Sequence, residues 1–193
     1  FILGWEAFER ARWLPKGLVW NDHAIAARGV ILAEFWHLYR RSALFEVAEA
    51  ERIVELAART AALLANKRLY TYASNHGMVQ NVGLLKLIIL FPEFDAITRY
   101  RHMAVERTLA QLQYYLSEEG IVREHSIGYH AYGVWLVQGA VKFLQHLGTR
   151  VPSGYLERLR RAEKFMAQVQ RPDGTIPRSG DTKSNRVTEL RSM

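Results

Sequence analysis

Two short stretches of the chain concentrate side chains that move protons or bind anions. Residues 123–130 read Arg-Glu-His-Ser-Ile-Gly-Tyr-His and hold two imidazoles, a carboxylate and a phenol. Residues 74–77 read Ser-Asn-His-Gly. An imidazole gains or loses a proton near neutral pH. A phenol, with an ordinary pKa of about 10, needs a neighbouring cation before it acts as a base. The two stretches therefore predict a proton-transfer site.

The stretch at residues 74–77 precedes an apolar helical pattern, so it lies at a predicted helix start. The free N–H groups and the dipole of a helix N-terminus attract anions. Asn75 and His76 together therefore suit a bound carboxylate. In the alternative reading, Ser74 or Asn75 only caps the helix and His76 packs against its neighbours.

The stretch at residues 123–130 crowds His125, Tyr129 and His130 into about one helical turn, next to Glu124. Three groups of this kind suit general acid and base catalysis. The alternative is a hydrated helix start capped by Ser126, in which the rings are partly buried.

A weaker candidate is His23, which can line the same cleft. Asn21 or Asp22 is expected to cap the helix at this point, and Gly148 to end a later one. Arg28 is expected to lie at the surface or in an ion pair. The sequence has no His-x-x-x-His or His-Glu-x-x-His pair, no cysteine, no glycine-rich phosphate loop and no Gly-x-Ser-x-Gly. We therefore expect neither a metal site nor a cofactor.

Helices must position these residues, because helical periodicity dominates and no strand pattern competes. The predicted helices span about residues 22–41, 42–63, 78–90, 92–116, 128–147 and 153–169. Short links between them favour antiparallel neighbours. Both polar stretches come at links that precede helices, so we expect them to face one cleft.

Composition limits the class of protein. The 193 residues predict one helical domain over 1–193, with 170–193 as its loop-rich C-terminal segment. The net charge of +7 attracts polyanions, but no run of Lys or Arg exceeds two residues, which argues against a nucleic-acid tail. The apolar run at 84–91 is interrupted by Lys86 and is too short to span a bilayer. The start at Phe1 suggests a piece of a longer protein.

The aromatic N-terminal region has two readings. Exposed tryptophans stack on sugar rings, whereas buried ones pack in the core, and the usual burial of tryptophan favours packing. The residues concerned are Trp5, Phe8, Trp13 and Trp20.

At these positions the chain resembles the helical domain of the heparinase II/III-like polysaccharide lyases, which include the oligo-alginate lyases. The matching pieces, in chain order, are Trp20-Asn21-Asp22-His23-Ala24 with Arg28, Ser74-Asn75-His76-Gly77 with Gln80 and Gly83-Leu84-Leu85, Phe91-Pro92-Glu93, Glu124-His125-Ser126-x-Gly128-Tyr129-His130, and Asp173-Gly174 with Gly180-Asp181. Each piece is short, and their joint order over nearly the whole chain carries the resemblance.

The resemblance implies an all-α fold, an incomplete (α/α) toroid of antiparallel helical hairpins that lacks the family's C-terminal β-sandwich. It also implies β-elimination at a uronic acid, which leaves a 4,5-unsaturated product. By the same resemblance, Asn75 and His76 neutralise the carboxylate and Tyr129 transfers the protons. The residues expected to bind substrate are His125, His130, Glu124, His23 and Gln80. The family usually completes its site with a histidine of the sandwich, so these 193 residues alone are expected to be inactive.

Two other functions remain open at this point. One is a non-catalytic helical module that binds acidic glycans or a protein partner. The other is a toroidal glycoside hydrolase, which needs two paired carboxylates that the sequence does not provide. The expected partner is an acidic polysaccharide or oligosaccharide, together with the missing sandwich domain of the same chain. Nucleic acid and membrane insertion are not expected. The family resemblance suggests a secreted or periplasmic bacterial protein.

Overall fold

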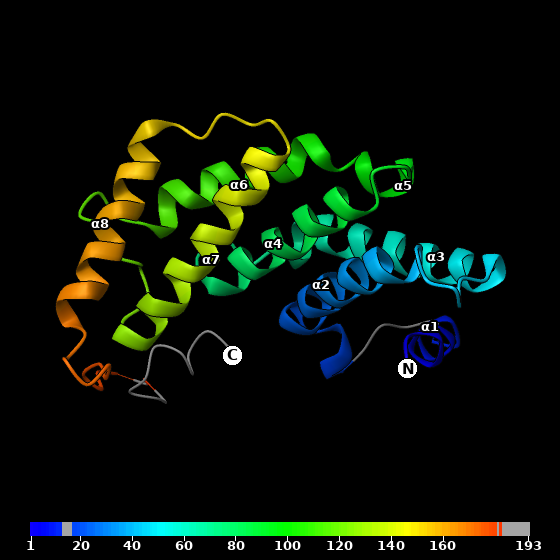
Figure 1. Cartoon of the computed structure of the whole chain (residues 1–193), viewed down its shortest axis with the longest axis horizontal. Helices are drawn as coiled ribbons and strands as arrows, with labels where there is room; N and C mark the ends of the chain where they lie inside the picture. The colour runs from blue at the N-terminus through cyan, green and yellow to red at the C-terminus, as the bar shows by residue number, and fades with distance from the viewer. Residues whose placement is uncertain (13–16, 181, 183–193) are drawn as a thin grey trace. The chain divides into compact units, whose positions relative to one another are not determined.

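The computed structural model describes residues 1–12, 17–180 and 182, and these residues fold into helices and links without a β-strand (Figure 1). The α-helices are α1 (Ile2–Arg10), α2 (Asp22–Tyr39), α3 (Val47–Ala65), α4 (Asn75–Leu90), α5 (Asp95–Thr98), α6 (Arg101–Tyr115), α7 (Ile127–His146) and α8 (Ser153–Val169). Short 3₁₀ turns, η1 (Leu18–Trp20) and η2 (Lys67–Leu69), occur in the links. Among the described helices, none combines the length and apolar character that crossing a membrane requires.

The predicted helix ends are confirmed where one side chain or one glycine marks them. The side chain of Asn21 accepts the His23 N–H at the start of α2, and that of Ser126 accepts the Tyr129 N–H at the start of α7. Gly148 follows α7 with a φ of 73°, the left-handed conformation that ends many helices.

Three predicted helices were wrong at their starts. The helix predicted over 78–90 begins three residues earlier, at Asn75. The second helix begins at Val47 and not at Ser42, because the Ser42 hydroxyl accepts the Leu44 N–H inside a turn. The stretch at 92–116 forms two helices, with Pro92 in the turn before α5. The Thr98 hydroxyl donates to the Phe94 carbonyl at 3.2 Å, a competing bond that bends or ends helices.

The chain forms two compact units. The first unit contains residues 1–71 and 79–106. The second contains residues 72–78 and continues from Arg107. Both polar stretches identified in the sequence belong to the second unit.

In the first unit, α2 packs against α3 and closely approaches α4. A side chain at Gly83 would place its Cβ 2.9 Å from the Ala26 carbonyl oxygen, so only glycine permits this approach. The ring of Trp36 stacks on Phe91 at 5.1 Å and extends the apolar core.

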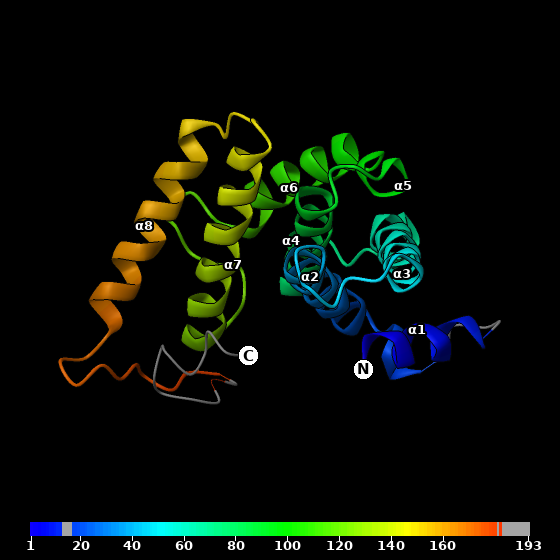
Figure 2. The same ribbon diagram turned by 45° about the vertical axis from the view of Figure 1, so that its right-hand side comes forward.

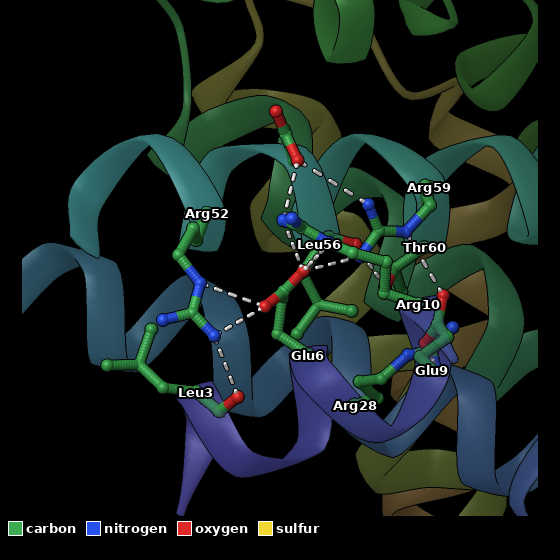
Figure 3. Close-up of polar contacts among 10 residues, drawn as sticks. Leu3, Glu6, Glu9, Arg10, Arg28, Arg52, Leu56, Arg59 and Thr60 are labelled. Atoms are coloured by element: carbon green, nitrogen blue, oxygen red, sulfur yellow. Dashed lines mark hydrogen bonds and ion pairs between the residues drawn. The ribbon is translucent and has the colours of Figure 1, made fainter. Parts of the chain in front are cut away.

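Ion pairs and hydrogen bonds between glutamates and arginines attach α1 to the rest of this unit (Figure 3). The only buried residues of α1 are Glu6 and Glu9. Glu6 accepts hydrogen bonds from Arg10 and Arg52 at 2.7 Å each, and Arg28, fully buried on α2, pairs with Glu9. Burial alone would raise the pKa of Glu6, but its two arginine partners outweigh that effect and lower the pKa. Of the two readings for Arg28, the ion pair is confirmed and the surface position is wrong.

The N-terminal aromatic residues pack on one another within this unit. Trp5 and Trp20 are partly buried, and Trp20 stacks on Phe8 at 6.0 Å. The Arg28 guanidinium lies 5.5 Å from the centre of the Trp5 ring. These contacts agree with the packing alternative, and Trp13 lies outside the described residues.

In the second unit, α7 and α8 run side by side in both views (Figures 1 and 2). The chain after α8 returns to α7, where Ile176 is fully buried against Ala131. The described part of the predicted loop, residues 170–180 and 182, contains no helix, and residues 181 and 183–193 lie outside the described residues.

Candidate functional site

Asn75 and His76 are the first two residues of α4, and hydrogen bonds fix the link that precedes them. The Ser74 hydroxyl accepts the His76 N–H at 3.2 Å, which confirms Ser74 as a capping residue. The buried amide of Gln111 donates to the carbonyl oxygens of Tyr72 and Ser74, each at 3.1 Å. The backbone that precedes Asn75 is therefore fixed to α6.

Glu124 joins the two polar stretches. Its Oε1 accepts the backbone N–H of Asn75 at 2.6 Å, across 49 positions of the chain. A carboxylate at this place also interacts favourably with the positive end of α4. The two stretches are therefore in contact, and that they face one cleft stays a prediction.

Tyr115 of α6 is fully buried and lies close enough to Glu124 to interact with its charge. Burial first, and then the charge of Glu124, raise the pKa of Tyr115 well above its usual value. A Cβ on Gly133 would lie 2.8 Å from the Tyr115 hydroxyl, so glycine at this point of α7 makes room for the phenol. Tyr115 thus fills the space between Glu124 and α7 as a neutral group.

Asn75 is 6% exposed, and its Oδ1 is buried with no donor among the described residues. A buried amide oxygen that its own protein leaves unsatisfied is uncommon and calls for an explanation. It suits a group held ready for a ligand.

Tyr129 sits in the first turn of α7 and is partly buried. The first three N–H groups of this helix donate to the hydroxyls of Ser179, Thr182 and Ser126, all at 3.1 Å. The start of α7 therefore has no N–H left in this turn for an anion. No described residue forms a hydrogen bond with the Tyr129 hydroxyl, which leaves the phenol open to a ligand.

His130 is held by backbone at both ring nitrogens. Nδ1 accepts the Val122 N–H at 3.1 Å, and Nε2 lies 3.3 Å from the Ala162 carbonyl oxygen, so Nε2 carries the proton. Burial is the main cause that lowers the pKa of His130, although the bond to Ala162 opposes it. The ring also meets Phe165 edge-on at 4.9 Å. His130 thus fixes α8 and the link before α7 to α7.

His130→Ala should lower the free energy of unfolding by about 2–4 kcal/mol, because it removes two buried hydrogen bonds and leaves a cavity. The lowered pKa also predicts a pH dependence. The unfolded state binds the proton more readily, so this histidine's contribution is complete above about pH 6.5 and declines below it. Urea unfolding between pH 5 and 8 measures both effects. His146→Ala, an exposed control on the same helix, should change little, and an equal loss in both variants would contradict the structural role of His130.

An open pocket of about 590 Å³ lies beside the stretch at 123–130 in the second unit. Its lining residues are Tyr114, Ile121, Val122, Arg123, Glu124, His125, Ser126, Ile127, His130, Phe165 and Ser179. His125 is exposed on this wall, whereas Asn75, His76 and Tyr129 do not line the pocket.

The other two predicted site residues belong to the first unit. Gln80 is buried, and its amide is engaged at both ends. It accepts the Thr71 N–H at 3.1 Å and donates to the Leu69 carbonyl at 2.7 Å. His23 follows the Asn21 cap at the start of α2, and Asp22 beside it accepts the Thr71 hydroxyl at 3.0 Å. Binding of substrate by Gln80 and His23 stays a prediction.

Sequence reasoning missed Gln111 and Tyr115, the two α6 residues that support the site. Both occupy interior positions of a helical pattern, where nothing local distinguishes them from other core residues. Among the described residues, no group of three metal-ligating side chains occurs.

Comparison with known proteins places this geometry in context. The family model described as Heparinase II/III N-terminus matches residues 9–193. Two crystal structures of heparan sulfate lyase HepC from Pedobacter heparinus, one of them a mutant, superpose with TM-scores of 0.69 and 0.71. Each is 18% identical in sequence and matches 91% of this chain, which spans 28% of the HepC chain. No curated protein matched the sequence. The predicted all-α, toroid-like fold class is confirmed.

Proposed function

Because the chain belongs to the Heparinase II/III N-terminus family, we propose that it is the helical part of a lyase that cleaves uronate polysaccharides by β-elimination. Its product would carry a 4,5-unsaturated uronate. The chain spans 28% of the HepC structures, so this activity is proposed for the full-length protein. The 193 residues alone are expected to be inactive, because the family resemblance assigns a completing histidine to another domain.

The observation that carries this proposal is the hydrogen bond from the Asn75 N–H to Glu124. It brings an amide, an imidazole and a phenol into one compact unit. These three kinds of group suit elimination, because the C5 proton of a uronate is only weakly acidic and the carboxylate beside it must be neutralised before a base can take that proton. A donor pair that neutralises the carboxylate stabilises the enolate-like intermediate as its charge develops.

Each step of the proposed reaction is assigned to particular residues. Asn75 donates from its side-chain N–H groups and His76 from its imidazole, and together they bind the carboxylate. Tyr129, as phenolate, takes the C5 proton when that proton lies on its face of the sugar. The C5–H electrons form the C4=C5 double bond while the C4–O4 bond breaks, and the phenol returns a proton to the departing O4. Electrons and protons balance without an external oxidant.

The substrate class proposed first is a sulfated glycosaminoglycan, with alginate as the next choice. The basic net charge of +7 suits any of these polyanions, and the HepC structures are those of a heparan sulfate lyase. A secreted or periplasmic location, also proposed, would bring the protein to such polymers.

The test uses the full-length protein with heparan sulfate, hyaluronan, chondroitin and alginate. The C4=C5 double bond absorbs in the ultraviolet, so absorbance is followed with time. A rise on one polymer is expected, with none from residues 1–193 alone. Folded full-length protein that produces no rise on any of the four would contradict the proposal and favour a module that only binds glycans.

A further inference from the structure

We propose that the pocket beside residues 121–127 is a subsite for an anionic sugar residue, in which Arg123 binds the sulfate or carboxylate and Tyr114 supports the ring. The inference rests on the proposed function. It assigns a separate place to a second sugar of the polymer, next to the one that reacts.

Arg123 is positioned by the residues around it. Its guanidinium carbon lies 5.1 Å from the centre of the Tyr114 ring, and its backbone N–H donates to the Tyr115 carbonyl at 3.0 Å. Tyr114 in turn packs on Tyr72, with ring centres 4.9 Å apart and planes tilted by 39°. A cation held against an aromatic ring loses less freedom when it binds an anion than a free side chain does.

The charges around the pocket leave Arg123 available. No carboxylate of the described residues pairs with it, although the exposed Glu119 is close enough to interact electrostatically. The pocket's own carboxylate, Glu124, is engaged by the Asn75 N–H. His125 adds an exposed imidazole on the same wall. An anion entering here therefore meets a guanidinium without displacing an ion pair.

The remaining lining suits a sugar. Ile121, Ile127 and Phe165 provide apolar surface, and Ser179, whose hydroxyl accepts the Ile127 N–H, also lines the pocket. A pyranose presents C–H groups on its faces and polar groups around its rim, so it matches a pocket with this division. The volume of about 590 Å³ falls within the range of about 300–1,000 Å³ usual for small-molecule sites.

The pocket is distinct from the proposed reacting groups. Successive residues of a helix are rotated by about 100°. Ile127 and His130 line the pocket, whereas Tyr129 projects from another face of α7. Glu124 lines the pocket and also holds the Asn75 N–H, so the sugar in the pocket is a neighbour of the reacting uronate. Loss of that sugar's contacts should weaken binding while the chemical step stays intact.

The experiment measures kcat and KM of the full-length protein on heparan sulfate for Arg123→Gln, Arg123→Lys and a control, Arg160→Gln. Arg160 is an exposed arginine of α8 in the same unit. Loss of a charged hydrogen bond is expected to raise KM about tenfold in Arg123→Gln with kcat nearly unchanged. Lysine should restore part of the affinity, and Arg160→Gln should change little.

The same KM in Arg123→Gln and in Arg160→Gln would overturn the proposal, and so would a loss confined to kcat. Repeating the series on hyaluronan identifies the group bound. An effect limited to the sulfated polymer indicates sulfate, and an equal effect on both indicates carboxylate.

If no polymer is cleaved, the proposed function fails, and calorimetric titration with a heparin hexasaccharide tests the subsite separately. Binding weakened only by Arg123→Gln would support the subsite, and unchanged binding or no binding would overturn it.

Discussion

Tyr129→Phe is expected to lower kcat of the full-length protein by a factor of about 10² to 10⁴, the usual contribution of a positioned acid or base. The substitution removes one oxygen from a side chain whose hydroxyl bonds to no described residue, so the fold should be undisturbed. The ultraviolet assay on the best polymer measures the loss. KM should change little, because the phenol acts on the protons and does not bind the carboxylate.

The matched control is Tyr132→Phe, one helical turn further along α7. Burial is the first cause that raises the pKa of Tyr132, and the charge of Tyr129 adds to it, so the two phenols are neighbours. Both are partly buried. The control should retain most of the activity. If Tyr129→Phe kept more than half of the wild-type kcat, another group would have to move the protons.

Glu124→Ala is expected to lower kcat about 10²-fold, since a displacement of about 1 Å in a reacting group is enough for such a loss. The substitution leaves the Asn75 N–H without its 2.6 Å acceptor and frees the start of α4 from the stretch at 123–130. Glu124→Gln keeps an acceptor oxygen and should retain activity within several fold. Steady-state kinetics of both variants, with circular dichroism to confirm folding, measure this effect.

The split between kcat and KM decides the role of Glu124. The sequence suggested that Glu124 binds substrate, and the structure places its carboxylate on backbone. Positioning predicts a loss in kcat that glutamine largely rescues. A raised KM in both variants, with kcat unchanged, would instead show direct contact with the substrate.

The helix ends were predictable from the sequence where a residue within one turn of the end determines it. Caps at Asn21 and Ser126 and the glycine at 148 mark helix ends, because each acts within one turn of the chain. The failures have tertiary causes. The start of α3 depends on the Tyr39 hydroxyl, which accepts the Glu46 N–H at 2.9 Å, and no pattern near Ser42 reveals it.

The candidate site was predictable by residue type and only partly by arrangement. Asn75, His76 and Tyr129 stood out because their side chains suit proton transfer and carboxylate binding. The sequence could not reveal that the side chains of His130 and Gln80 form hydrogen bonds with the backbone. Their partners are N–H and carbonyl groups of a kind that nearly every residue carries. Arg123 was visible in the sequence, but only the stacking of Tyr114 gives it a defined direction.

The charged attachment of α1 has a consequence for how related sequences can change. Substituting Glu9 alone leaves the fully buried Arg28 of α2 without its partner, at a cost of about 3–5 kcal/mol for a buried pair. Substituting Glu6 should cost less, because its partner Arg52 is 38% exposed and water can solvate the charge. Replacing the whole group by apolar residues of similar volume is often neutral. Natural variation at these positions should therefore be concerted, so that Glu9 and Arg28 are kept or lost together.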